Sequence, residues 1–256
     1  MTAAGKSPRK LFPRGLSQPD NGFRFSVDSL LLSCFISPKD NSSIADLGCG
    51  CGVIGLGLIL ANPDKKIQVT GLDSNPEMIA HARKNSLSLG MTNSFSVVNI
   101  DLSRVGSKSF NPESFELAVA NPPWLKPGAG RIPGDPSKQQ ASFIEQEGLD
   151  HFFRAGSFLL KNKGKIGLVF DARRLDELLE SMKRFSLVPK QLILVHGHQN
   201  KSASLVLVQG VKNAGPGLSV LPPLFLYDQS GRLTIQAMEF CPFLGCNPGR
   251  QKKNFA

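Results

Sequence analysis

Alternating strand and helix signals, which begin at Ser43, constrain this chain more than any other feature of its sequence. The first apolar run, residues 43–47, leads into the turn Gly48-Cys49-Gly50-Cys51-Gly52, and an apolar helix pattern follows at residues 53–60. Glycines between a strand and a helix let the backbone turn sharply and approach a ligand closely. Repeated strand and helix signals are typical of a parallel sheet with crossover helices. We therefore predict an α/β fold.

The sheet is predicted to have seven strands, mostly parallel, with an antiparallel closing strand. After the first strand, the others are expected at residues 67–72, 95–100, 115–120, 165–170, 191–195 and 204–208. A short polar turn separates the last two, which indicates an antiparallel hairpin. Further helices are expected at residues 76–88, 143–160 and 174–185. An apolar helix before the sheet is expected to be capped by Ser26 or Asp28.

The length of 256 residues fits one α/β domain with a modest extension. We expect the α/β domain itself to lie at residues 43–235. Four basic residues mixed with Gly, Pro and Ser predict a flexible basic arm at residues 1–17. Residues 18–42 are expected to form an N-terminal extension on the substrate side. Residues 236–256 are expected to form a basic C-terminal tail.

Composition limits the partners and the compartment. The net charge of +10 favours a polyanion such as nucleic acid over a small acidic metabolite. Five scattered cysteines indicate a reducing compartment, and the four histidines form no metal-spaced cluster. No stretch approaches the roughly 18 apolar residues of a membrane span, and no apolar run follows the basic N-terminus. We expect a cytoplasmic monomer with no metal and no membrane partner.

The stretch Asn121-Pro122-Pro123-Trp124 directly follows one of the predicted strands. An amine conjugated to an aromatic ring is a poor nucleophile, because its lone pair is delocalised into the ring. The Asn121 side-chain carbonyl and the Pro122 backbone carbonyl can accept the two N–H groups of such an amine, and Trp124 can stack on the base. Both prolines stiffen the backbone and donate no competing hydrogen bond. These are candidate catalytic residues, although Asn-Pro is also a common turn dipeptide.

Carboxylates stand at the ends of three other predicted strands: Asp46, Asp73 and Asp101. Because the carboxyl ends of parallel strands share one edge of a sheet, we expect these acids and Asn121 to line one ligand site. Asp73 can accept hydrogen bonds from ribose hydroxyls, and Asp101 is placed to accept an adenine amino group. Each acid alone could equally cap a helix, but the ordered set of acceptors favours a ligand site.

The chemistry of this site favours a cationic cofactor over a dinucleotide. Asp46 precedes the first glycine by two residues, where its carboxylate is expected to point into the pocket and to repel a pyrophosphate. The turn also lacks the Gly-x-Gly-x-x-Gly spacing that brings phosphate to a helix N-terminus. S-adenosylmethionine has a sulfonium, an ammonium and no phosphate. It is therefore the predicted cofactor, bound by Asp46, Gly48, Gly50, Gly52, Asp73, Asp101 and Asn121.

Two short stretches carry the candidate substrate-binding residues. Phe23 and Phe25 flank Arg24 after the turn signal Asn21-Gly22, and such aromatic and basic side chains can hold a base. They could equally form a small hairpin that packs on the core. The second stretch contributes Trp124 and, in the loop that follows it, Lys126.

With these motifs in order, the chain resembles the class I S-adenosylmethionine-dependent methyltransferases of the N6-adenine or glutamine-amide type. Residues 22–31 and 216–228 narrow the match, because they look like the bacterial tRNA(Val) adenine-N6 methyltransferase family. The resemblance covers roughly residues 18–235. It implies a Rossmann-like class I methyltransferase domain and methyl transfer to N6 of the adenine next to the anticodon. Trp124 stands where a Tyr or Phe is more usual in that family.

Three other functions are left open by the residues. A protein glutamine N5-methyltransferase uses the same Asn-Pro-Pro-aromatic arrangement, but the basic charge and the lack of a recognisable helical N-terminal partner-binding domain count against it. Ribosomal RNA is an alternative acceptor for the same chemistry. An RNA-binding protein without catalysis would need only the basic segments, and the intact ordered set of acceptors counts against that function.

Overall fold

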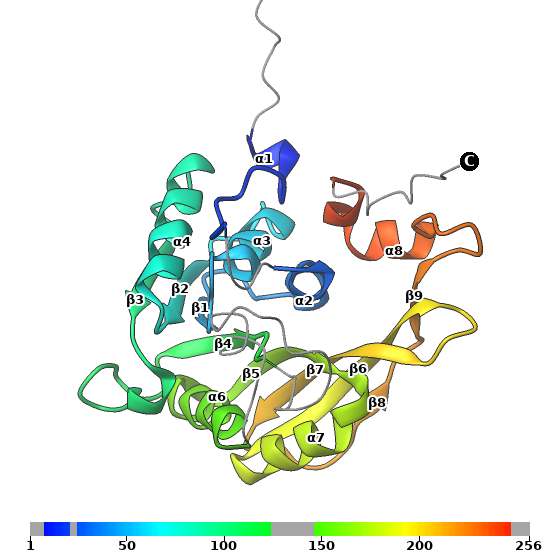
Figure 1. The fold of residues 1–256 in the computed structure, drawn as a ribbon. Helices are drawn as coiled ribbons and strands as arrows, with labels where there is room; N and C mark the ends of the chain where they lie inside the picture. The colour runs from blue at the N-terminus through cyan, green and yellow to red at the C-terminus, as the bar shows by residue number, and fades with distance from the viewer. Residues whose placement is uncertain (1–7, 21–24, 124–145, 247–256) are drawn as a thin grey trace, which may run out of the picture.

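A nine-stranded sheet organises the computed structural model, which describes residues 8–20, 25–123 and 146–246. The strand order is β3-β2-β1-β4-β5-β7-β6-β8, and β9 pairs with β6 farther along that strand (Figure 1). The strands are β1 (Ser43–Leu47), β2 (Gln68–Asp73), β3 (Phe95–Asn99), β4 (Phe115–Ala120), β5 (Leu160–Asp171), β6 (Leu187–His198), β7 (Ala203–Lys212), β8 (Ser219–Val220) and β9 (Leu224–Tyr227).

Helices cover both faces of this sheet (Figure 1). Those that pack on one face are α2 (Val27–Phe35), α3 (Val53–Ala61), α4 (Pro76–Ser88) and α8 (Ile235–Phe240). Those on the other face are α6 (Gln146–Leu159) and α7 (Leu175–Arg184). Shorter helical turns are α1 (Pro8–Leu11), η1 (Leu102–Arg104), η2 (Ala172–Arg174) and η3 (Pro242–Cys246). Within the described ranges, no helix combines the length and apolar character needed to cross a membrane.

The direction of the strands decides where ligands can bind. Strands β1 to β5 pair in parallel, and β7 is antiparallel to both β5 and β6, so β6 runs parallel to β5. The carboxyl ends of β1 to β6 therefore lie at one edge of the sheet. The predicted parallel α/β sheet and its closing antiparallel hairpin are confirmed.

The predicted count of seven strands is too low. Strands β8 and β9 come from the stretch before residue 235 and add two short partners to the edge of β6. Pro222 and Pro223 lie between them and donate no backbone hydrogen bond, which keeps these edge strands short. The strands at residues 43–47 and 115–120 begin and end where the sequence predicts.

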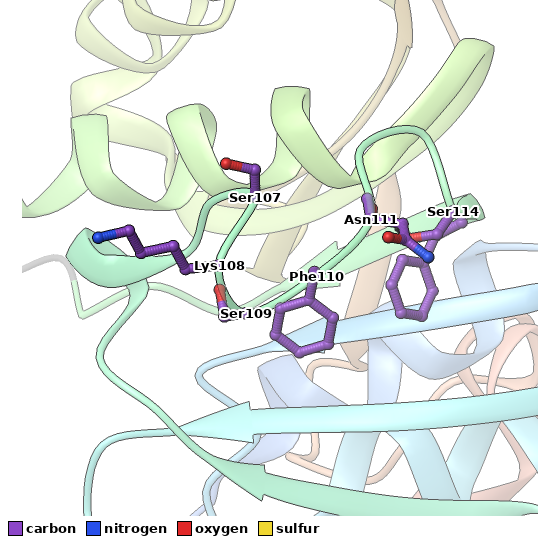
Figure 2. Close-up of a pocket in the computed structure, with 7 residues that line it drawn as sticks. Ser107, Lys108, Ser109, Phe110, Asn111 and Ser114 are labelled. Carbon is purple, nitrogen blue, oxygen red and sulfur yellow. Dashed lines mark hydrogen bonds between the residues drawn. The ribbon is translucent and has the colours of Figure 1, made fainter.

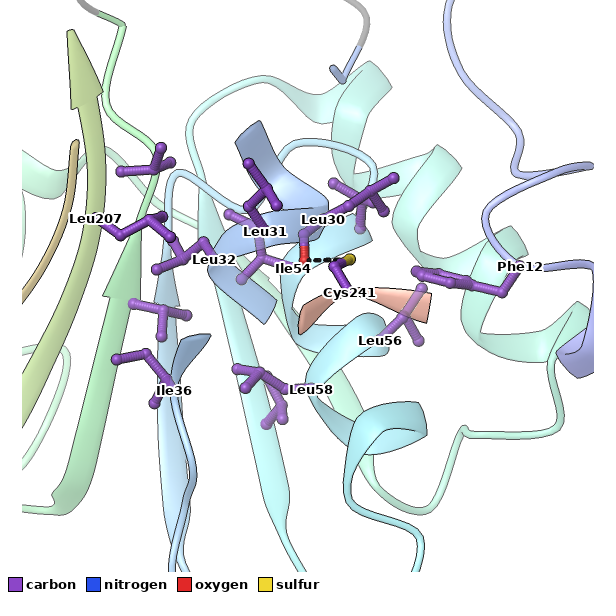
Figure 3. Packing of buried hydrophobic residues seen from close by; sticks show 14 of the residues in the cluster. Phe12, Leu30, Leu31, Leu32, Ile36, Ile54, Leu56, Leu58, Leu207 and Cys241 are labelled. Carbon is purple, nitrogen blue, oxygen red and sulfur yellow. Dashed lines mark hydrogen bonds between the residues drawn. The ribbon is translucent and has the colours of Figure 1, made fainter. Parts of the chain in front are cut away.

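Buried apolar side chains form one cluster on each face of the sheet. Neighbours on β1 alternate between them, with Ile44 on the α2/α3 face and Ala45 on the α6/α7 face. Figure 3 shows Leu32 of α2 between Leu207 of β7 and Ile54 of α3. Because both faces are covered, the central strands read as continuous apolar runs and were predictable from sequence.

Helices α2 and α3 approach closely at Gly57. A Cβ atom there would lie 2.8 Å from Oγ and 2.9 Å from Cβ of the buried Ser33, so one helix would have to shift. We expect Gly57→Ala to lower the free energy of unfolding by about 1–2 kcal/mol, even after the gain in helix propensity. Urea denaturation measures this, with Gly106→Ala as the control because nothing lies within 4 Å of that position. A Gly57→Ala variant as stable as the wild type would contradict this packing.

The prediction of a flexible basic arm is wrong for its described part, residues 8–17. Phe12, which Figure 3 shows in the α2/α3 cluster, is 1% exposed. Its ring meets that of Phe243 edge-on, with the ring centroids 4.9 Å apart. The Arg9 guanidinium donates to the carbonyls of Leu89 and Gly90, both at 2.8 Å, which satisfies the end of α4. One large aromatic side chain therefore anchors a segment whose composition alone indicated disorder.

The expected C-terminal tail is also structured as far as residue 246. Helix α8 and η3 fill residues 235–246, and Cys241 and Leu244 are buried in the α2/α3 cluster. The thiol of Cys241 donates to the Leu30 carbonyl at 3.4 Å (Figure 3). These two buried side chains attach the segment to the α2/α3 cluster.

Candidate active site

A cavity of about 580 Å³ opens at the carboxyl edge of the sheet, a size typical of small-ligand sites. Loops after β1 to β4 form its floor, and α2, α4 and α6 contribute to its walls. It is lined by Gln18, Pro19, Phe25, Ser29, Gly48, Cys49, Gly50, Cys51, Val53, Ile54, Asp73, Ser74, Asn75, Met78, Asp101, Leu102, Asn121, Pro123, Gly148, His151 and Phe152.

The glycine turn after β1 brings backbone to the cavity. Gly48, Gly50 and Gly52 have φ values of 67°, 53° and 84°, in the left-handed region that residues with a Cβ rarely adopt. The amides of Gly48 and Cys49 donate to the Leu72 carbonyl at 2.8 and 3.0 Å, which ties the turn to the end of β2. Glycine is thus required by the backbone here, and the turn is held rigidly beside the cavity.

Two carboxylates line the cavity. Asp73 accepts the Gly50 amide at 2.8 Å through Oδ2 and the Asn75 amide at 2.8 Å through Oδ1, and burial raises its pKa. Asp101 is more open and accepts the Ser103 amide at 2.8 Å, which lowers its pKa. Both oxygens of Asp73 keep lone pairs for a ligand, because each accepts a single backbone hydrogen bond in the structure.

Asp46 differs from the expectation that it points into the pocket. It is fully buried and is not among the residues that line the cavity. Its Oδ2 accepts the Gly55 amide at 2.9 Å in the first turn of α3, while Oδ1 has no partner among the residues that the structure describes. Burial raises the pKa of Asp46 to about 7, the Gly55 amide opposes the rise, and the charge of Asp73 adds to it. Asp46 is therefore a poorly compensated carboxylate just behind the glycine turn.

Within the described ranges, Asn121 also has a buried side-chain atom without a partner. Its Nδ2 donates to the hydroxyl oxygen of Ser29 at 3.0 Å, and its Oδ1 has no partner among the described residues. Ser29 is 3% exposed and stands in the first turn of α2. The hydrogen bond directs the amide nitrogen to Ser29 and leaves the carbonyl oxygen, an acceptor, buried without a donor in a residue that lines the cavity. An orphaned buried acceptor is costly without a ligand, which is typical of binding sites.

The structure brings together seven of the predicted site residues. The cavity is lined by Gly48, Gly50, Asp73, Asp101, Asn121, Pro123 and Phe25. Asp46, Gly52 and the buried Pro122 lie just outside it. Phe23, Arg24, Trp124 and Lys126 lie outside the described residues, and Phe25 is not part of a strand. Ser26 is the N-cap residue of α2, as predicted, but its hydroxyl donates to Asp28. The predicted hydrogen bond from a helix amide to the Ser26 side chain does not form.

Sequence reasoning missed several residues of the cavity wall. Ser29 comes from α2, Met78 from α4, and His151 with Phe152 from α6. The Phe152 ring lies so close to the turn that a Cβ on Gly48 would be 3.0 Å from it. Their helical spacing indicates only which side of each helix is apolar, so no sequence signal assigned them to the site.

The lining fits S-adenosylmethionine better than a phosphate-containing cofactor. It includes the carboxylates of Asp73 and Asp101 and, among the described residues, neither lysine nor arginine. The Asp46 carboxylate, whose Oδ1 has no partner among the described residues, adds negative charge behind the glycine turn when it is ionised. A sulfonium and an ammonium meet these demands, whereas a pyrophosphate would be repelled. Apolar neighbours such as Met78 and Leu102 suit the adenosine part.

A second hollow lies in the loop between η1 and β4, with a volume of about 460 Å³ (Figure 2). Its described lining, which includes Lys108, Phe110 and Asn111, contains none of the predicted site residues. It is an open surface feature away from the strand ends. In the part of the chain that the structure describes, no three His, Cys, Asp or Glu side chains are grouped to hold a metal ion.

Known proteins place the chain in a family. The methyltransferase small domain model matches residues 24–184, more than half of the chain. A tRNA1(Val) adenine(37)-N6-methyltransferase of Haemophilus influenzae is 23% identical over 227 residues, which are 88% of this chain and 92% of that relative. The ribosomal RNA large subunit methyltransferase G of Psychromonas ingrahamii is 39% identical over 110 residues, which cover 41% of this chain and 25% of that relative.

A solved structure confirms the class of fold. The crystal structure described as a predicted O-methyltransferase from Agrobacterium tumefaciens superposes with a TM-score of 0.66 at 19% identity, over 85% of this chain and 96% of that one. The predicted Rossmann-like methyltransferase fold is therefore confirmed, as is the resemblance to tRNA(Val) adenine-N6 methyltransferases. The chain belongs to the methyltransferase small domain family, and S-adenosyl-L-methionine is its cofactor.

Proposed function

We propose that this methyltransferase transfers a methyl group to the exocyclic N6 of an adenine in tRNA, next to the anticodon of tRNA(Val). The observation that carries the proposal is the buried, unpartnered Oδ1 of Asn121 at the end of β4. This atom is a hydrogen-bond acceptor without a hydrogen-bond donor. Asn121 lines the cavity that fits S-adenosylmethionine.

Asn121 acts on the amine by localising its lone pair. Its Oδ1 accepts one N–H of the adenine amine, and the carbonyl of the adjacent Pro122 accepts the other. These two bonds pull the amine out of conjugation and direct its lone pair toward the donor. Trp124, which follows in sequence, is assigned the role of stacking on the base, in place of the usual Tyr or Phe.

Bound S-adenosyl-L-methionine supplies an electrophilic methyl group. The carboxylates hold the donor, with Asp73 on the ribose, Asp101 on the adenine amino group and Asp46 behind the cationic methionine part. Transfer would break the C–S bond of the bound donor as the C–N bond to N6 forms, and N6 would release its extra proton to solvent. Positioning and electrostatics supply the rate, so no covalent enzyme intermediate is needed.

Transfer RNA is favoured as the acceptor by the extent of the similarity. Relatives named for tRNA1(Val) match 82–88% of the chain, whereas the relative named for ribosomal RNA matches 41% of it. The net charge of +10 supports a polyanionic acceptor over a protein glutamine. Because the higher identity of 39% belongs to the shorter match, ribosomal RNA is the second candidate. The unpartnered acceptor at Asn121 counts against a purely RNA-binding role.

The base position is tested with two transcripts of tRNA(Val) that differ only at position 37. We expect labelled methyl groups from S-adenosylmethionine to appear as N6-methyladenosine in the transcript with adenine 37 and not in the transcript with guanine 37. Equal incorporation into both would contradict the position. Incorporation only into ribosomal RNA or into a protein glutamine would show that the acceptor is another molecule. Transfer to a conjugated NH2 nitrogen would still hold.

Ser29 is the positioning residue for the Asn121 amide. Without its hydroxyl, Nδ2 loses its partner and the amide is free to turn its nitrogen toward the substrate. We expect Ser29→Ala to lower kcat about tenfold while the KM for RNA and the cofactor affinity stay within twofold, and Ser29→Thr to restore most of the activity. Steady-state kinetics with both variants separate this role from a structural one. An unchanged kcat for Ser29→Ala would rule it out.

A further inference from the structure

The basic N-terminal segment lies beside the cavity and leads into it. After the anchor at Phe12, the Ser17 amide donates to Asn85 Oδ1 at 2.6 Å, and the Ser17 hydroxyl contacts His81 Nδ1 at 2.8 Å. Asn85 also donates back to the Ser17 carbonyl at 2.9 Å. The next two residues, Gln18 and Pro19, line the cavity. The segment therefore follows α4 to the cofactor cavity with its backbone fixed on both sides of residue 14.

Exposed basic side chains lie along the N-terminal segment and on the adjacent helix α4. Residues 8–19 contain Arg9, Lys10 and Arg14 and no acidic residue. Arg9 is bonded to the carbonyls at the end of α4, but Lys10 and Arg14 are exposed. Lys84 is exposed as well and lies three residues after His81, so it shares the face of α4 that meets the segment. We call Lys10, Arg14 and Lys84 the basic track.

The basic track is chemically free to bind an anion. None of its three cations forms an ion pair with a residue that the structure describes. The nearest acidic residues in sequence are Asp20 and Glu77, both exposed, and Glu77 lies 4.0 Å from His81. The track thus carries three positive charges, and its two nearest acidic residues in sequence carry two negative charges.

The chain itself limits how far the track lies from the cavity. Gln18 follows Arg14 by four positions, and a fully extended chain spans at most about 14 Å over four positions. Arg14 is thus within reach of the backbone of a nucleic acid whose base enters the cavity. None of the three cations lines the cavity, so a ligand that contacts them extends outside it, as an RNA strand does.

We propose that the basic track binds phosphates of the RNA strand that flanks the target adenine. The inference rests on the proposed function and adds a docking surface to it. Phe12 and Arg9 fix the segment before RNA arrives, so little conformational entropy is lost when phosphates bind. The contacts are to the backbone and carry no sequence information, so the track orients the strand while the pocket selects the base.

The test reverses the charge of the track without touching the cavity. The variant is Lys10→Glu/Arg14→Glu/Lys84→Glu. The matched control is Lys163→Glu/Lys183→Glu, which changes exposed lysines at the start of β5 and at the end of α7, on the far side of the sheet. We expect the track variant to raise the KM for tRNA at least tenfold and to leave kcat at saturating RNA, cofactor affinity and melting temperature unchanged. The control should keep the wild-type KM.

Salt dependence identifies the contacts as phosphates. Loss of three contacts to a single strand should reduce the slope of log affinity against log salt concentration by about 2. A comparable loss of tRNA affinity in the control variant, or an unchanged KM for tRNA in the track variant, would overturn the proposal. So would a track that binds anionic lipid vesicles but not tRNA.

The outcomes also separate this proposal from the proposed function. If the wild type binds tRNA through the track but methylates another acceptor, the proposed function fails and the docking surface stands. If the wild type methylates tRNA and the track variant does so with the same KM, the docking surface alone fails.

Discussion

Asn121→Ala is expected to lower methyl transfer to RNA by about 10²–10³-fold while the affinity for S-adenosylmethionine stays within twofold of the wild type. Removal of Oδ1 leaves the adenine amine conjugated with its ring, because no side chain then holds its N–H. The donor is held by other residues, so its binding is preserved. Single-turnover transfer to tRNA and calorimetry of cofactor binding measure the two effects separately.

The control for this variant is Asn111→Ala. Asn111 is an exposed asparagine that lines the second hollow (Figure 2), so its loss should change neither transfer nor cofactor binding. Transfer by Asn121→Ala at more than a tenth of the wild-type rate would contradict the assignment. A parallel loss of cofactor affinity would mean that Asn121 binds S-adenosylmethionine instead of the adenine amine.

Asp46→Asn is expected to have the largest effect on stability, and its sign depends on pH. Burial raises the pKa of Asp46 to about 7, whereas an unfolded aspartate titrates near 4. Between these values the folded chain holds a proton that the unfolded chain has released, so stability falls as pH rises from about 4 to 7. Above pH 7 the ionised carboxylate costs on the order of 4 kcal/mol relative to low pH. The asparagine variant should escape that cost.

The same substitution should weaken cofactor binding. A cationic donor favours the ionised form of Asp46, so donor binding at pH 6.5 should release a proton from the wild-type protein. The donor should bind about tenfold more weakly to the Asp46→Asn variant. Calorimetry in two buffers of different ionisation enthalpy measures the proton, and urea denaturation at pH 5.5 and 8 measures the stability. An unchanged affinity together with no gain in stability at pH 8 would refute this role for Asp46.

The site residues that directly follow parallel strands were predictable from the sequence. Asp73, Asp101 and Asn121 were predicted to meet because parallel strands place their carboxyl ends at one edge, and the cavity contains all three. The apolar strands β1 and β4 were predicted to the residue because they are buried between turn signals.

What the sequence could not predict depends on packing between distant elements. Ser29 reaches Asn121 across 92 positions because α2 lies on the sheet, and His151 reaches the cavity from α6. Asp46 was placed correctly along the chain, but its carboxylate turns to the start of α3 instead of the cavity. The basic segment was predicted to be flexible because composition does not reveal that Phe12 packs against the distant Phe243.

The central claim is tested most directly by nucleoside analysis of methylated RNA. The purified protein is incubated with labelled S-adenosylmethionine and total RNA from a strain that lacks its gene, and the RNA is separated by size before digestion. The account predicts N6-methyladenosine in the tRNA fraction alone. Label in ribosomal RNA would retain the chemistry and change the acceptor, whereas unlabelled RNA together with labelled glutamine in added protein extract would contradict the account.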